Sequence, residues 1–321
     1  MPRRTAAIPH RGASVQNVRV PTPERVQIVE VSPRDGLQAE ARTLPTETKL
    51  TLLERLADAG HTVIEATSFV SPTAIPQLAD ADDVLRRMVR RPGVRYSVLV
   101  PNERGLERAI AAGADEIAVF VSATEGYARK NLRRSRDEAV ATAVAVTSAA
   151  VASGRRVRGY ISMVVADPDD GPTAPESVVR IAERLLAAGC GEISLGDTTG
   201  VGTPADVRRL IAAHRDGGIA PDRLAVHFHD TYGQALVNVL TALDLGVRTV
   251  DASAGGIGGS PFAKSAAGNL ATEDLVWMLD GMGIATGVDL RALAKISAWL
   301  ADALGHPAPG RVARALNAIP A

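Results

Sequence analysis

The chain alternates eight times between short runs rich in β-branched residues and longer segments of helical periodicity. The predicted strands are residues 26–31, 62–66, 96–100, 116–121, 157–163, 192–195, 224–228 and 249–252. The helical patterns between them include residues 46–59, 135–152, 174–188, 204–214 and 234–245. Several of these helices end at a glycine, such as Gly60, Gly113 and Gly246. Glycine there supplies the left-handed cap that turns a chain back into a strand.

Eight such units predict a closed (β/α)8 TIM barrel of the α/β class, because a doubly wound open sheet usually needs fewer strands. Two further helical patterns, residues 270–279 and 290–304, are expected to close the ring and pack on its outside. We therefore expect a flexible N-terminal arm over residues 1–25, one catalytic domain over 26–305 and a loose C-terminal tail over 306–321.

Composition argues against two classes of partner. The 36 lysines and arginines balance 36 aspartates and glutamates, so no net charge attracts nucleic acid or an anionic membrane. Aromatic residues make up 3% of the chain and offer few surfaces for base stacking. No run approaches 18 uninterrupted apolar residues. The single cysteine, Cys190, is expected to be buried, and the lack of an intrachain disulfide is typical of a reducing compartment.

The first 25 residues leave the location open between two interpretations. They are rich in Arg and Pro and contain no acidic residue before Glu24, which is also typical of a mitochondrial transit peptide. The prolines disfavour an amphipathic helix, and arginine exceeds lysine throughout the chain. We favour a cytoplasmic protein with a flexible arm, and the mitochondrial matrix is the alternative.

A metal site is indicated at the carboxyl ends of the predicted strands, where TIM barrels carry their chemistry. His227 and His229 lie two residues apart at the end of a predicted strand, so both imidazoles point to one face. Asp35 follows another strand and reaches the same rim. A solvated strand end or a hydrogen-bonded core pair would also explain the two histidines. The same rim carries Arg34, Glu65, Arg158, Asp197 and the glycine-rich stretch 255–259.

Five motifs in register give the chain a specific resemblance. It is similar, from about residue 26 to about residue 288, to the 3-hydroxy-3-methylglutaryl-coenzyme A lyase family of the metal-dependent TIM-barrel lyase and synthase superfamily. The motifs are Val31-Ser-Pro-Arg-Asp-Gly-Leu-Gln38, Ile64-Glu-Ala-Thr-Ser-Phe-Val70, Ser194-Leu-Gly-Asp-Thr-Thr-Gly-Val-Gly-Thr-Pro204, Val226-His-Phe-His-Asp-Thr-Tyr-Gly-Gln-Ala235 and Gly268-Asn-Leu-Ala-Thr-Glu-Asp274.

The resemblance implies a divalent ion, Mg²⁺ or Mn²⁺, held by Asp35, His227, His229 and Asn269. One carboxylate, two imidazoles and one amide oxygen suit an octahedral cation with positions left for substrate. The implied reaction is a retro-Claisen cleavage that releases acetyl-coenzyme A and a 3-oxo acid such as acetoacetate.

The resemblance also implies roles for the charged residues around the ion. The metal would acidify the substrate alcohol, and Arg34 would offset the charge of the departing enolate. Glu65 and Asp197 would hold or relay protons. Simpler explanations stay open for each of these residues. Arg34 could pair only with Asp35 or Glu65, and Asp197 could cap the next helix or tie down its loop.

Asn269 could likewise be the N-cap of the helix that follows it. A non-haem iron oxygenase triad is a further alternative for two histidines and a carboxylate. The fourth protein ligand and the barrel pattern argue against it.

The chain departs from the family at Ser260, where the lyases carry the loop cysteine treated as the acid that protonates the enolate. An alcohol is a far weaker acid than a thiol with a pKa of about 8.5. Ser260 is thus predicted to be a catalytic residue, but a weaker acid than the cysteine of the family. It indicates a slower lyase that relays a proton, a related Claisen or aldol enzyme with another hydroxy acid, or a non-catalytic descendant. The glycines before it would let a loop close over substrate, or form a bare turn.

The coenzyme A side carries both matches and differences. Asn131 and Arg158 match family positions linked to the acyl-coenzyme A and are predicted to bind substrate. Ala41 and Lys264 differ from the family, and the acidic segment 163–170 is unfavourable for phosphates. A basic cluster could meet those phosphates or be a solvated helix face: Arg129, Lys130, Arg133, Arg134 and Arg136. We expect a small-molecule partner, an acyl-coenzyme A, and allow for a homodimer.

Overall fold

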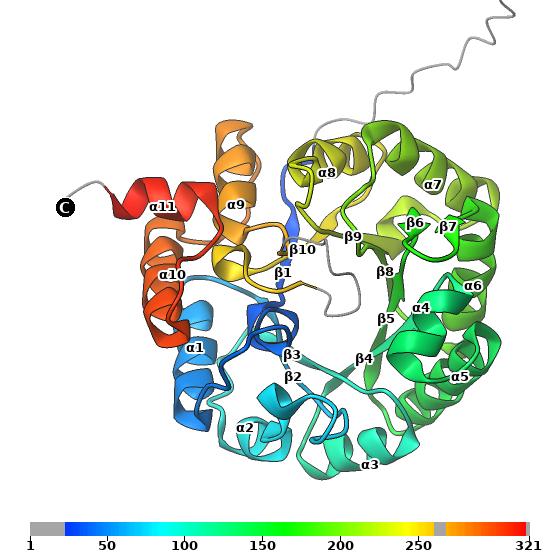
Figure 1. Ribbon diagram of the computed structural model, residues 1–321, viewed down its shortest axis with the longest axis horizontal. Coiled ribbons are helices and arrows are strands. Elements are labelled where there is room, and N and C mark those ends of the chain that lie inside the picture. Colours follow the sequence, from blue (N-terminus) through cyan, green and yellow to red (C-terminus); the bar gives the residue numbers. More distant parts are fainter. Residues whose placement is uncertain (1–22, 260–267, 319–321) are drawn as a thin grey trace, which may run out of the picture.

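Eight parallel strands close into a barrel in the computed structural model, which describes residues 23–259 and 268–318. Around the ring they follow the order β1-β10-β9-β8-β5-β4-β3-β2. In Figure 1 the strands are seen as a ring, with the helices around its outside. The strands are β1 (Gln27–Glu30), β2 (Val63–Ser68), β3 (Arg95–Leu99), β4 (Glu116–Ser122), β5 (Arg156–Ser162), β8 (Glu192–Asp197), β9 (Leu224–Phe228) and β10 (Thr249–Ala252).

Helices cover the outside of the barrel and continue past the last strand. Those between strands are α1 (Thr46–Asp58), α2 (Ala81–Arg87), α3 (Glu103–Ala111), α4 (Glu125–Tyr127), α5 (Arg136–Ala152), α6 (Pro175–Ala188), α7 (Pro204–Asp216) and α8 (Ala235–Asp244). After β10 come α9 (Thr272–Gly281), α10 (Leu290–Leu304) and α11 (Arg311–Asn317). These last three lie between α8 and α1 in Figure 1. The predicted α/β TIM barrel with extra C-terminal helices is confirmed.

The sequence forms these elements for local reasons. β2 is buried along its whole length, as expected for a parallel strand covered on both faces. Helix α5 begins at a capping box in which Ser135 and Glu138 satisfy each other's backbone N–H groups. Gly60 ends the turn after α1 at φ 98°, and a Cβ there would lie 2.1 Å from the carbonyl oxygen of Gly287. Only glycine permits this close approach of the chain to the C-terminal region.

The C-terminal segment corrects one expectation. Residues 306–321 were expected to be loose, but Arg311–Asn317 form α11, and Ala313 is buried. The backbone N–H groups of Arg311 and Val312 donate to the carboxylate of Asp274, which anchors the start of this helix. The Pro- and Ala-rich sequence before it contains no hint of that long-range anchor.

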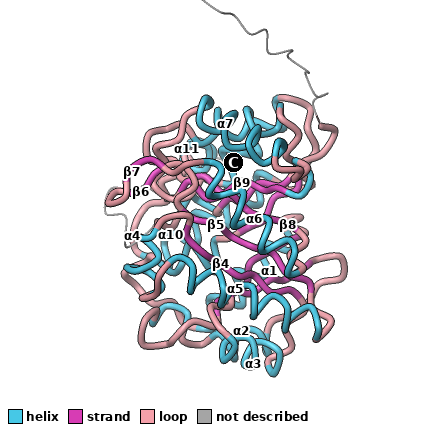
Figure 2. Tube along the Cα trace, turned by 90° about the vertical axis from the view of Figure 1, so that its right-hand side faces the viewer, coloured by secondary structure: helices cyan, strands magenta, loops and turns pink. Residues whose placement is uncertain are grey.

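Other parts of the chain add detail that the alternation did not predict. A two-stranded antiparallel sheet, β6 (Ala166–Asp167) and β7 (Gly171–Pro172), follows β5. In the side view of Figure 2, it lies at the same edge of the molecule as α4.

Cys190 is buried, as predicted. Residues 1–22 of the predicted N-terminal arm, Ser260 and Lys264 lie outside the described residues. Among those described, no helix is long and apolar enough to cross a membrane.

Candidate active site

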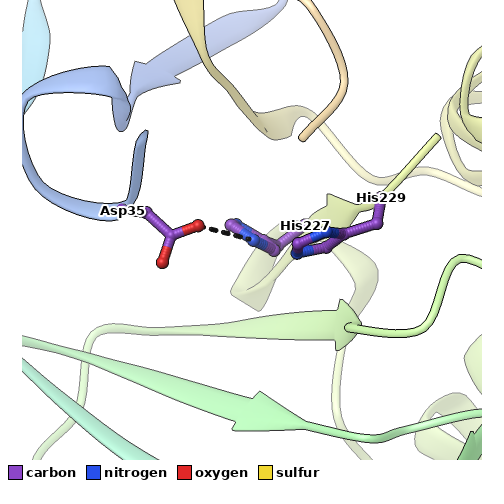
Figure 3. Close-up of side chains that lie close together, drawn as sticks. All are labelled: Asp35, His227 and His229. Atoms are coloured by element: carbon purple, nitrogen blue, oxygen red, sulfur yellow. Dashed lines mark ion pairs between the residues drawn. The ribbon is translucent and has the colours of Figure 1, made fainter. Parts of the chain in front are cut away.

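Three of the predicted metal ligands converge at the carboxyl ends of β1 and β9. Asp35, His227 and His229 each offer a ligand atom, and these atoms lie within 4.8 Å of one another. The rings of the two histidines are 5.4 Å apart between centroids, and His227 Nε2 lies 3.7 Å from Asp35 Oδ2. Figure 3 shows the Asp35 carboxylate facing His227, with His229 beside it.

Asp35 is presented by a tight π-helical turn, η1 (Ser32–Gly36), directly after β1. The carbonyl oxygen of Val31 accepts hydrogen bonds from the backbone N–H groups of Arg34, Asp35 and Gly36, at 2.8 to 3.1 Å. A Cβ at Gly36 would lie 2.8 Å from Ile257, so glycine lets the turn pack against the segment after β10. The turn therefore fixes both charged side chains relative to the barrel.

Asn269 completes the set of four and supplies the strongest indication of a cation. Its Nδ2 donates to Asp35 Oδ2 at 2.9 Å and to the carbonyl oxygen of Ile257 at 3.2 Å. Its Oδ1 is buried and has no hydrogen-bond partner among the described residues. Since α9 begins at Thr272, Asn269 is not its N-cap. A buried amide oxygen without a donor, beside a carboxylate and two imidazoles, fits a hard or borderline divalent cation.

Electrostatics affect the two kinds of ligand group differently. Burial alone would raise the pKa of Asp35, but Arg34 and the two histidines outweigh it and lower the pKa. Burial alone would lower the pKa of His227, yet its hydrogen bond to Asp251 and the charge of Asp35 raise it. The anionic Asp35 is thus ready to bind a cation, and the ion would displace any proton from His227.

Arg34 is held between two carboxylates at the edge of this cluster. Its guanidinium contacts Asp35, and its Nε donates to Glu65 Oε2 at 2.6 Å. Burial opposes the charge of Arg34, but Glu65 and Asp35 raise its pKa above the ordinary value. Burial raises the pKa of Glu65 against the opposing effect of Arg34. Glu65 Oε1 is buried with no hydrogen-bond partner in the described part of the chain.

Asp197 lies at the end of β8 and ties down the loop that follows. Its Oδ2 accepts from the backbone N–H of Gly202 at 2.8 Å, and its Oδ1 accepts from Thr199 Oγ1 at 3.4 Å. Burial raises its pKa, and these bonds oppose the rise. Helix α7 has its own capping box, formed by Thr203 and Asp206. Of the simpler explanations for Asp197, the loop anchor therefore matches the structure and the helix cap does not.

A cavity of about 590 Å³ opens above the cluster. It is large enough for a small acyl group and part of its carrier. Glu65, Asp197 and Arg158 are not among the residues that line it. The lining includes Arg34, Asp35, His227, His229, Asn131 and Lys130.

Comparison with known proteins identifies the family. A family model described as HMGL-like matches residues 25–300. The chain belongs to the HMGL-like family. It is 48% identical to the mitochondrial hydroxymethylglutaryl-CoA lyase of Bos taurus over 293 residues. The matched region covers 91% of this chain and 90% of that relative. It is 47% identical to the cytoplasmic 3-hydroxy-3-methylglutaryl-CoA lyase of Rattus norvegicus, over 91% of this chain and 85% of the relative.

Solved structures agree with this HMGL-like assignment. The hydroxymethylglutaryl-CoA lyase of Pseudomonas aeruginosa matches with a TM-score of 0.89 and 44% identity, over 92% of this chain and 99% of that one. An HMG-CoA lyase of Acinetobacter baumannii, solved in complex with coenzyme A and 3-methylmalate, matches with a TM-score of 0.87 and 38% identity, over 91% and 95%. The HMGL-like family depends on a divalent metal, and the Asp35 cluster is the matching feature of this chain.

In the acidic segment 163–170 of this HMGL-like chain, the carboxylates bind other groups of the protein. Asp167 accepts from Thr124 Oγ1 at 2.5 Å and from the backbone N–H of Tyr127 at 3.2 Å. Asp170 accepts from the backbone N–H of Gly126 at 2.7 Å, and Asp169 pairs with Lys130. These carboxylates hold α4 and the adjoining turn η3 (Ala128–Leu132), which carries Asn131. Asp167 and Asp170 thus hold this part of the protein, and Asp169 is paired with a cation that offsets its repulsion of phosphates.

Sequence reasoning missed Asp251 of the HMGL-like barrel, in the interior of β10. Burial would raise its pKa, but Arg158 and His227 outweigh it and lower the pKa to about 2. The available signal was an acidic residue inside the apolar run Val250-Asp251-Ala252, which requires a buried partner. That partner is Arg158, which pairs with Asp251 and Glu192. Its predicted role in substrate binding stays a prediction.

Proposed function

We propose that this protein cleaves 3-hydroxy-3-methylglutaryl-coenzyme A to acetyl-coenzyme A and acetoacetate, using Mg²⁺ or Mn²⁺. The cation would be held by Asp35, His227, His229 and Asn269. The observation that carries the proposal is the meeting of these four groups from distant parts of the chain: Asp35, His227 and His229 line the cavity, and Asn269 contacts Asp35 beside them. The high identity to lyases over most of the chain supports the same reaction.

The reaction removes one proton and returns one. The tertiary hydroxyl of the substrate loses its proton, the adjacent C–C bond breaks, and the carbinol carbon becomes the ketone of acetoacetate. The bonding electrons stay on the thioester fragment as an enolate, which gains a proton to give acetyl-coenzyme A. When bound, the cation supplies Lewis-acid polarisation of the substrate oxygens.

Arg34 is assigned to the developing enolate charge. It lines the cavity, its pKa is raised by two carboxylates, and Glu65 fixes the direction of its guanidinium. A fixed cation aimed at a developing oxyanion stabilises a transition state without reorganisation. Its pairing with Asp35 and Glu65 is consistent with this role, because both carboxylates orient it.

The two remaining carboxylates receive different roles. Glu65 Oε1 accepts no hydrogen bond from the residues that the structure describes, and burial raises the pKa of Glu65. It is therefore the better candidate to hold a proton near the site. Both oxygens of Asp197 accept hydrogen bonds from its own loop. We assign Asp197 to positioning that loop, whose residue Thr198 lines the cavity.

Ser260 is assigned to the final proton transfer, at the position where the lyase family carries cysteine. Its weaker acidity favours a slower lyase in which the hydroxyl relays a proton. The same replacement favours one second candidate, a Claisen or aldol reaction on a related hydroxyacyl thioester. Asn131, on the cavity wall, is assigned to the acyl-coenzyme A. A cytoplasmic location and a homodimer stay predictions of the sequence.

The test is direct turnover. Purified protein, stripped of metal and then supplied with Mg²⁺ or Mn²⁺, is mixed with 3-hydroxy-3-methylglutaryl-coenzyme A, and acetoacetate is followed. We expect product only with added cation. A parallel panel of other hydroxyacyl thioesters separates the lyase from the second candidate. No acetoacetate from either the wild type or a Ser260→Cys variant would contradict the proposed reaction.

A further inference from the structure

Asp251 connects the proposed cation site to the interior of the barrel. It lies on β10 directly beside His227 of β9, because the two residues are partners in the parallel register. Asp251 Oδ2 lies 3.2 Å from His227 Nδ1. The other ring nitrogen, Nε2, faces Asp35. One imidazole therefore lies between a carboxylate of the cation site and a carboxylate of the barrel interior.

The contacts of Asp251 define the proton position on the ring. Its Oδ1 accepts from Arg158 Nη2 at 2.6 Å, and its Oδ2 accepts from Arg158 Nη1 at 3.1 Å. Ser194 Oγ donates to Oδ2 at 2.8 Å. A carboxylate surrounded by these donors is an acceptor only, so Nδ1 of His227 carries the hydrogen that faces it. Nε2 of the neutral ring then has its lone pair directed toward Asp35.

Arg158 is committed to this arrangement. Besides its two bonds to Asp251, its Nε donates to Glu192 at 2.7 Å and its Nη1 donates to Tyr160 Oη at 2.7 Å. Its guanidinium also lies 4.8 Å from the centroid of the Tyr160 ring. The residue is 4% exposed and does not line the cavity. Its position suits the support of Asp251 and not contact with a ligand in the cavity.

We propose that Asp251 is a positioning residue for His227. Its carboxylate fixes the ring in the tautomer and orientation that present Nε2 to the cation, and the two hydrogen bonds from Arg158 hold the carboxylate in place. This inference deepens the proposed function and rests on its cation site. A carboxylate behind a ligating histidine orients the ring and increases its basicity, and its loss typically weakens metal affinity 10- to 100-fold.

The experiment compares Mn²⁺ binding by Asp251→Asn, Ser194→Ala and wild type, measured by electron paramagnetic resonance without substrate. Asparagine would set an N–H group against either Arg158 or His227, so it removes the fixed tautomer while keeping the shape. We expect its Kd for Mn²⁺ to rise by about 10- to 100-fold. Ser194→Ala removes a hydrogen bond to the same oxygen but leaves the charge and His227, so its Kd should stay within about threefold of wild type.

Wild-type affinity in Asp251→Asn, or an equal loss in both variants, would overturn the proposal. A second measurement does not depend on any variant folding. Nitrogen NMR of ¹⁵N-histidine-labelled, metal-free wild type, at a pH where the ring is neutral, reports its tautomer. Hydrogen on Nδ1 of His227 supports the proposal, and hydrogen on Nε2 overturns it. Because neither readout involves the thioester, a wild type that binds Mn²⁺ without cleaving substrate contradicts the proposed function alone.

Discussion

The inner site and the outer rim of the cavity are built in opposite ways. In the inner site, the side chains of Glu65 and Asp251 are fully buried and bound to arginines. At the outer rim, Lys130 and Asp169 pair while their side chains are 52% and 45% exposed. Breaking a buried pair leaves an uncompensated charge and costs several kcal/mol, whereas exposed pairs contribute about 0 to 1 kcal/mol. The inner site is therefore rigid, and the rim can exchange its partners at little cost.

This difference indicates a division of labour. The chemistry requires the cation ligands and Arg34 in one geometry, which buried hydrogen bonds enforce. Recognition of a large carrier requires only that charges at the rim be available when it arrives. A substitution should accordingly change turnover when made in the inner site and change KM when made at the rim.

The largest effect is expected from loss of a metal ligand. His229→Ala removes one imidazole from the cluster around Asp35 and should lower kcat/KM for the thioester by roughly 10³-fold or more, together with Mn²⁺ affinity. Acetoacetate release and Mn²⁺ titration measure the two effects. His306→Ala, at a half-exposed histidine that contacts Glu40, is the control and should behave as wild type. If His229→Ala kept a tenth of the wild-type activity, the inner site would not be more sensitive to substitution than the outer rim.

The second-largest effect is expected in the pH dependence of stability, through Glu273, which lies behind the glycine-rich segment 255–259. Glu273 is fully buried, accepts from Gly255 N–H and Ser297 Oγ, and faces Glu30. Burial raises its pKa from 4.5 to about 7. The folded state thus binds more protons than the unfolded state between these values, so its stability falls as the pH rises through this window.

From pH 4 to pH 8 this group alone should lower the free energy of unfolding by about 3 kcal/mol. Glu273→Gln should remove that contribution, measured as the change in urea midpoints between the two pH values. Glu107→Gln, at an exposed glutamate on α3, is the control and should follow the wild-type curve. An unchanged pH dependence in Glu273→Gln would show that this buried carboxyl is not the titrating group.

Ser260→Cys tests the final proton transfer to the enolate. A thiol is a stronger acid than an alcohol, so the variant should raise kcat by about tenfold or more if protonation of the enolate limits turnover. Ser71→Cys places a thiol elsewhere on the cavity wall and should leave kcat unchanged. Equal rates in wild type and Ser260→Cys would place the slow step before that proton transfer.

The smallest effect is expected at the rim. Lys130→Ala should raise KM for the acyl-coenzyme A about two- to fivefold with kcat unchanged, because an exposed charge contributes little. The effect should shrink as salt is added. Arg129→Ala is the matched control: it pairs with Glu125 and does not line the cavity. A large fall in kcat for Lys130→Ala would contradict the division between the two regions.

The sequence predicted the barrel and the candidate ligands because both follow from local patterns. Strand and helix periods are written into successive residues, and parallel strands bring their carboxyl ends to one rim. The positions of Asp35, His227, His229 and Asn269 followed from that rule and from motifs in register. Their meeting is what the structure then shows for this chain.

Only the tertiary structure decided which atoms each side chain contacts. Arg158 and Asp251 are 93 residues apart, and nothing in either local sequence pairs them. The same holds for Asp274 at the start of α11 and for Asp167 beneath α4. A residue's place on a strand is set by its neighbours along the chain, whereas its partner is set by the geometry of the closed barrel. Hence the sequence located the candidate ligands, and only the fold showed that Arg158 pairs with Asp251.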